Sequence, residues 1–82
     1  MPNQTPEIDP DRHFFGTKIE QLRLARGLTQ TQLAELSGVS QPHVSALERG
    51  LWDPRLGTLL AMARALNVEP ADLLPPAKRR RK

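Results

Sequence analysis

The chain carries its strongest structural signal between residues 29 and 50, which read TQTQLAELSGVSQPHVSALERG. Thr29 stands three residues before Gln32, the spacing of a capping box, so a helix is predicted to start near Gln30. Gly38 follows at a point where a helix can end in a left-handed residue without steric cost. The apolar residues expected on one side of this helix are Leu33, Ala34 and Leu36.

A second helix must begin almost at once after this turn. Ser40 can cap it, and Pro42 falls in its first turn, where a missing amide hydrogen costs little. Because Pro42 cannot donate, the Ser40 hydroxyl is expected to accept from the amide of His43. Val44 and Leu47 then mark the buried side of the helix. So short a connection predicts that the two helices cross and that the second one is exposed for contact with a partner.

These two helices and their flanks resemble a known family of DNA-binding domains. The predicted shared core of the two helices consists of Leu33, Val39, Val44 and Leu47. The stretch looks like a helix-turn-helix. Extended from FGTKIEQLRLARGLTQ to NVEPADLL, the chain resembles the Cro and phage-repressor-like (XRE) family. The resemblance implies a compact, all-α, phage-repressor-like domain of five helices that binds double-stranded DNA.

The first of these helices is expected at about residues 15–26. Ile19 and Leu22 are predicted to point inward, and Phe15 to pack at the start of the helix. Gly27 ends the helix before Leu28 enters the core.

A fourth helix at about residues 56–66 and a short fifth helix at residues 70–74 follow from the same periodicity. Pro70 suits the first turn of the fifth helix, and Pro75 and Pro76 forbid its continuation. The fourth helix is expected to bury a stripe of Leu56, Leu59, Leu60, Ala63 and Leu66. No part of the sequence predicts a strand.

The basic residues are concentrated at one end of the chain. The formal net charge is +3, but residues 78–82 contribute +5, which leaves seven basic and nine acidic side chains in residues 1–77. Attraction to DNA must then come from a few basic side chains on one face of the domain, from the basic residues at the end of the chain, or from both. We predict a disordered lead-in at 1–13, the domain at 14–75, and a basic flexible tail at 76–82. The tail can be merely solvated or can contact DNA phosphates.

Composition also narrows the classes of function. There is no cysteine, so the chain can form no disulfide or thiolate metal site, and two histidines are too few for a zinc site. We expect no metal and no cofactor. No apolar run is long enough for a membrane span or a signal-peptide core. No pair of closely placed acids and no glycine-rich phosphate loop indicates an enzyme. We therefore expect a cytoplasmic protein that is not an enzyme and does not contact a membrane.

The outer side of the helix that follows Ser40 is the predicted DNA-reading surface. An α-helix fits the major groove of B-DNA, and Gln41 can pair bidentately with the N6 and N7 of adenine. Pro42 and Ala46 cannot donate to base edges, so direct readout is expected to be sparse and DNA shape important. The predicted groove contacts are Ser40, Gln41, Pro42, His43, Ser45 and Ala46.

Other side chains are predicted to reach the DNA backbone. Gln30 sits at a helix N-terminus, where its side chain and amide can bind a phosphate, and the resemblance implies the same role. A plain capping contact is the alternative for Gln30. Arg49, near the end of the reading helix, and Arg55, just past the next loop, are the other predicted phosphate partners, unless they are free surface arginines. His43 can contact a base, contact a phosphate when protonated, or remain solvated.

Glu48 lies on the inward side of the reading helix, where a carboxylate needs a partner. Arg23 of the first helix is placed to provide it, and the resemblance implies the same structural ion pair. The resemblance also places dimer contacts in the loop after the reading helix and in the helices beyond it. The candidate dimer contacts are Leu51, Trp52, Met62 and Leu73. Trp52, the only tryptophan, can instead cover part of the core.

The expected function is that of a sequence-specific transcriptional regulator, a repressor that binds a palindromic operator as a homodimer. Two alternatives stay open. One is the antitoxin and autorepressor of a toxin–antitoxin pair, whose protein partner is the toxin. The other is a protein-interaction module that uses the helix-turn-helix only as a scaffold. A toxin or another regulator is the possible protein partner.

Overall fold

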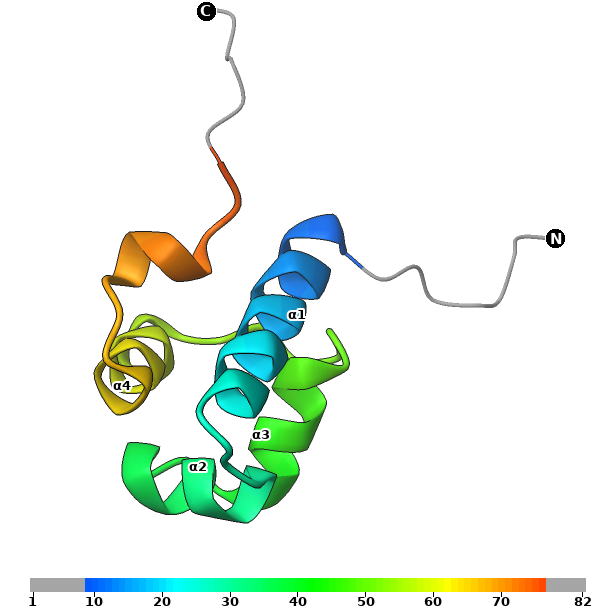
Figure 1. Cartoon of the computed structure of the whole chain (residues 1–82). Coiled ribbons are helices and arrows are strands. Elements are labelled where there is room, and N and C mark those ends of the chain that lie inside the picture. Colours follow the sequence, from blue (N-terminus) through cyan, green and yellow to red (C-terminus); the bar gives the residue numbers. More distant parts are fainter. Residues whose placement is uncertain (1–8, 77–82) are drawn as a thin grey trace, which may run out of the picture.

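A computed structural model describes residues 9–76 of the chain (Figure 1). Within that range there are four α-helices and one short 3-10 helix, with no strand. The elements are α1 (Pro10–Ala25), α2 (Gln30–Ser37), α3 (Gln41–Glu48), α4 (Leu56–Leu66) and η1 (Pro70–Leu73). The all-α prediction is confirmed, but the predicted fifth helix is a single 3-10 turn. Residues 1–8 and 77–82, which hold most of the predicted lead-in and tail, lie outside the described residues.

Helix α1 begins five residues before its predicted start, so residues 10–13 belong to the helix and not to a disordered lead-in. The carboxylate of Asp9 accepts a hydrogen bond from the amide of Asp11 at 2.8 Å, and Pro10 occupies the first turn. An acidic cap followed by proline is a helix-start signal. The predicted lead-in was therefore wrong for residues 10–13, because a proline among polar residues can mark the first turn of a helix as well as a disordered segment.

Both ends of α2 and the start of α3 agree with the predictions. The Thr29 hydroxyl accepts from the amide of Gln32 at 3.0 Å, and the Gln32 side chain accepts from the amide of Thr29 at 2.8 Å. Gly38 ends α2 with a left-handed φ of 79°. The Ser40 hydroxyl then caps α3 by accepting from the amide of His43 at 3.4 Å.

The core lies between α1, α3 and α4, and α2 and η1 close its two ends (Figure 1). Its fully or nearly fully buried apolar residues are Phe15, Ile19, Leu33, Val44, Leu47, Met62, Ala63, Leu66 and Leu73. Burying a large apolar side chain of this kind contributes about 1.5–3 kcal/mol. Met62 and Leu73 are therefore core residues, and their prediction as dimer contacts was wrong.

Two leucines that were predicted to point inward are exposed. Leu36 is 60% exposed because the inward side of α2 centres on Leu33 and Ser37, one turn apart. Leu56 is 73% exposed at the first position of α4, ahead of the turns that bury Met62 and Leu66.

The backbone of α1 passes very close to the end of α3 at Gly16. A Cβ atom on Gly16 would overlap the carbonyl oxygen of Leu47 and lie 2.9 Å from that of Glu48. Only glycine allows this approach. The sequence alone does not reveal the role of Gly16, because that role depends on where α3 lies. Among the described residues, no helix is both long and apolar enough to cross a membrane.

Candidate nucleic-acid interface

Helix α3 separates buried from exposed side chains along its length. Its inward side consists of Val44, Leu47 and Glu48, all buried. Of the predicted DNA contacts in or next to α3, Ser40, Gln41, Pro42, His43 and Arg49 are exposed, whereas Ser45 and Ala46 are half-buried. The structure therefore places these side chains along one accessible surface, and α2 crosses the start of α3 (Figure 1).

Arg23 and Glu48 form a two-pronged ion pair between α1 and α3. The Nε of Arg23 lies 2.6 Å from Oε2 of Glu48, and a second guanidinium nitrogen lies 3.1 Å from Oε1. Both residues are only 8% exposed. The hydrogen bond with Glu48 raises the pKa of the Arg23 guanidinium above its usual value. Arg23 also donates to the carbonyl oxygen of Leu28 at 2.8 Å, so the pair links α1, α3 and the segment before α2.

A chain of side-chain hydrogen bonds leads from this pair to the surface. Nε2 of Gln30 donates to Oε1 of Glu48 at 2.9 Å, and Nε2 of Gln41 donates to Oε1 of Gln30 at 2.8 Å. An ionised carboxylate only accepts, so the Gln30 amide must turn its nitrogen to Glu48 and its oxygen to Gln41. Gln41 keeps its oxygen and one amide hydrogen free, the set needed for bidentate pairing with adenine.

The opposite flank of α3 has a separate contact. The ring of His43 stacks on that of Trp52, with centroids 4.2 Å apart and planes inclined by 14°. The Nδ1 atom of His43 lies 3.0 Å from the Ser40 hydroxyl. Trp52 is half-buried and packs against the core, as one of its two predicted roles requires. The sequence held no signal for the stack, since the two residues belong to different elements.

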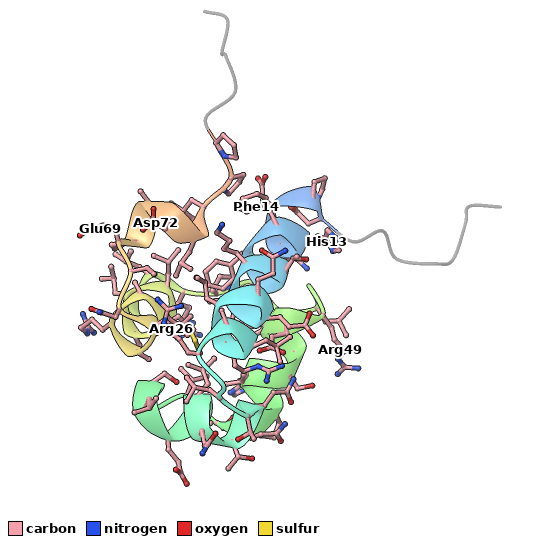
Figure 2. All side chains as sticks on the ribbon, in the orientation of Figure 1. His13, Phe14, Arg26, Arg49, Glu69 and Asp72 are labelled. Carbon is pink, nitrogen blue, oxygen red and sulfur yellow. The ribbon has the colours of Figure 1, made fainter. Side chains whose placement is uncertain are left out.

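The two predicted phosphate partners outside α2 are both exposed. Arg49 follows the last residue of α3 and projects away from the rest of the domain (Figure 2). Arg55 directly precedes α4 at the end of the loop that contains Trp52. The acidic residues Glu69 and Asp72 lie at η1, far from Arg49 (Figure 2).

Helices α2 and α3 are short and are joined at the left-handed Gly38, and α3 exposes Gln41 in a fixed position. This is the arrangement with which a helix-turn-helix places its second helix in the major groove. The fold and this surface define a helix-turn-helix DNA-binding protein. The chain belongs to the HTH_3 helix-turn-helix family, whose sequence model matches residues 19–73. The resemblance to XRE regulators noted from the sequence is confirmed.

Relatives with assigned names support the same class. The chain is 40% identical over 65 residues to y4dJ, an uncharacterised HTH-type transcriptional regulator of Sinorhizobium fredii, covering 79% of this chain and 84% of that one. It is similar to the restriction–modification controller protein C.AhdI from Aeromonas hydrophila, with 40% identity, a TM-score of 0.74, and coverage of 76% and 94%.

A third similar protein is the P22 c2 repressor, solved in complex with a synthetic operator. Its TM-score is 0.70 at 33% identity, covering 73% of this chain and 91% of the repressor. This chain is thus a helix-turn-helix transcriptional regulator, similar to repressors and restriction–modification controllers.

Proposed function

We propose that this regulator is a repressor that binds a palindromic operator as a homodimer, with α3 of each copy in the major groove. The observation that carries the proposal is the hydrogen bond from Gln41 to Gln30, anchored on the buried pair of Arg23 and Glu48. Side chains that read bases must be held in place before binding, because ordering them on binding weakens affinity. Gln41 is held in this way.

Most of the predicted contact residues have a defined role in this proposal. Gln41 reads adenine, and the N-terminus of α2 at Gln30 receives a phosphate through its amides and the helix dipole. Arg49 and Arg55 neutralise further phosphates. Pro42 and Ala46 offer only apolar contact, for example with a thymine methyl group. Ser45 is a minor hydrogen-bonding partner beside them.

Dimerisation is proposed through the loop that joins α3 and α4. Leu51 at its start is 55% exposed and Leu56 at the first residue of α4 is 73% exposed. Two exposed leucines at the ends of one loop, beside half-buried Trp52, offer an apolar surface that a second copy can cover. A symmetric pair would present two copies of α3, as a palindrome requires.

Selection of bound duplexes from a random DNA pool by the full chain tests the proposal. A palindromic consensus is expected. Gln41→Ala and Arg49→Ala should each lower affinity for the selected duplex by about tenfold or more, on the scale of a base pair contact or a charged hydrogen bond. Gln21→Ala and Arg64→Ala, at exposed positions of α1 and α4, are the matched controls. No enrichment, or equal binding by all four variants, would disprove DNA reading by α3.

The similarity to controller proteins favours a second candidate role, control of restriction–modification genes. A reporter gene placed behind the selected operator distinguishes the two roles. Repression at every protein concentration supports a simple repressor. Activation at any protein concentration would contradict a simple repressor and favour the controller role.

A further inference from the structure

The contact between His43 and Trp52 sets the direction of one further polar group on the proposed DNA-binding surface. Gln41 and His43 are two residues apart in α3, so they lie about 200° apart around its axis. Gln41 faces α2, to which it is hydrogen-bonded, and His43 faces the loop after α3, where it stacks on Trp52. The two flanks of the first turn of α3 are thus held by different parts of the fold.

A helix that lies in the major groove has one flank toward each of the two phosphate backbones that border the groove. The flank that carries Gln41 faces the N-terminus of α2, which is proposed to contact one of these two backbones. The flank of His43 therefore faces the other backbone. Exposed Arg55 ends the same loop that carries Trp52 and adds a positive charge there. Asp53 of that loop is also exposed, and it lines a hollow of about 520 Å³ with Asp9 and Asp11 at the start of α1.

The Ser40 hydroxyl determines which ring nitrogen of His43 is available. This hydroxyl accepts from the amide of His43, and its hydrogen is free to donate to Nδ1, 3.0 Å away. Ser40 thus engages Nδ1, and Nε2 is the ring nitrogen left to contact a partner outside the domain. Trp52 covers one ring face, so the rotation of the imidazole is restricted and Nε2 keeps its direction.

Building on the proposed function, we infer that His43 donates from Nε2 to a backbone phosphate of the bound DNA, and that Trp52 is the positioning residue that holds the imidazole for this contact. The ligand is a phosphate oxygen on the strand that borders the loop between α3 and α4. Trp52 itself touches no DNA in this arrangement.

The stack is tested first on the free protein. Trp52 is the only tryptophan, so the intrinsic fluorescence of the full chain reports on its ring alone. The imidazole covers one face of the indole, so His43→Ala should change the intensity or the wavelength of the emission. His13→Ala, at the other histidine, should leave it unchanged. Equal emission from wild type and His43→Ala would overturn the inference.

The phosphate contact is tested on the selected duplex with single methylphosphonate substitutions, each of which removes one phosphate charge. Wild type should lose about tenfold in affinity at one phosphate of each half-site, the scale of a hydrogen bond to a charged group. His43→Ala should show that loss on unmodified DNA and no further loss at that methylphosphonate. 7-Deazaguanine lacks the N7 acceptor of guanine. If replacing one guanine by it costs the wild type the affinity that His43→Ala loses, His43 contacts a base and the assignment is wrong.

The role of Trp52 is tested by non-additivity. Trp52→Leu should weaken binding about as much as His43→Ala, and the double variant should bind no worse than His43→Ala alone. Trp52→Phe, which keeps an aromatic ring in the stack, should retain most of the affinity and the sensitivity to that one methylphosphonate. Additive losses, or a Trp52→Phe variant that folds but behaves like His43→Ala, would refute the positioning role.

These results separate this inference from the proposed function. Loss of binding by Gln41→Ala together with wild-type affinity for His43→Ala overturns the inference alone. If no duplex is selected, both are wrong.

Discussion

Gln41 donates a hydrogen bond to the side-chain oxygen of Gln30, 2.8 Å away, and so joins the start of α3 to the start of α2. Gln30 is held in turn by the carboxylate of Glu48 at 2.9 Å. The residue proposed to read adenine is thus connected through two hydrogen bonds to a buried ion pair. Orientation of the reading side chain and stability of the fold depend on the same carboxylate.

Gln30→Ala should separate these two properties. Glu48 keeps both of its hydrogen bonds from Arg23, so the free energy of unfolding should fall by less than about 1 kcal/mol. Gln41 loses its anchor, so affinity for the selected duplex should fall about tenfold. Urea unfolding and DNA titration measure the two effects. The double variant with Gln41→Ala should bind no worse than Gln41→Ala alone, and fully additive losses would show that the two glutamines act independently.

Arg23→Ala should lower the free energy of unfolding by about 3 kcal/mol or more, because it leaves the buried carboxylate of Glu48 without its cation. Replacing both partners, with Arg23→Met and Glu48→Leu, should restore most of that stability. The double variant should still bind DNA weakly, since Gln30 has lost its acceptor. Urea denaturation of the wild type, Arg23→Ala and the double variant measures the three free energies of unfolding. A loss well under 1 kcal/mol for Arg23→Ala would mean that water replaces the ion pair easily.

Gly16→Ala should destabilise the fold although alanine is the better helix former. The propensity gain is about 1 kcal/mol, but the new methyl group overlaps the backbone at the end of α3, so we expect a net loss of about 2 kcal/mol or more. Gly57→Ala is the matched control, since a Cβ there meets no atom within 4 Å. That change should stabilise by about 0.5–1 kcal/mol. Thermal unfolding of both variants measures the two effects. Melting temperatures that shift in the same direction would contradict the prediction.

Leu56→Asp should dissociate the proposed dimer without unfolding the subunit. Leu56 is 73% exposed in the single chain, so its replacement should change subunit stability by no more than about 0.5 kcal/mol. A charge in an apolar contact between copies should shift the dimer to monomer. Analytical ultracentrifugation measures the mass, with Leu24→Asp, 59% exposed on α1, as control. An unchanged dimer, or loss of the dimer only in the control, would place the interface elsewhere.

The ends of α2 and α3 could be predicted from the sequence because their determinants are local. Thr29, Gly38 and Ser40 act within three or four residues of themselves, so their spacing alone defines the caps. The start of α1 has an equally local signal at Asp9 and Pro10, but a proline among polar residues is also typical of a disordered segment.

The features that could not be predicted all depend on contacts between separate elements. Gly16 matters only because the end of α3 lies against it, and the stack of His43 on Trp52 depends on the path of a loop. Met62 was a candidate dimer contact because the family resemblance places such contacts in the helices that follow the reading helix. Only the packing of α4 decides that it is buried.

The division of α3 into a packed inner side and a free outer side bears on how such a regulator can diversify. Gln41 and Pro42 are exposed and make no part of the core, whereas Gly16 tolerates no added atom. Mutations on the outer side can therefore accumulate without loss of stability, and each can shift the preferred target site. Gene duplicates of this chain would be able to acquire separate targets while retaining one unchanged scaffold.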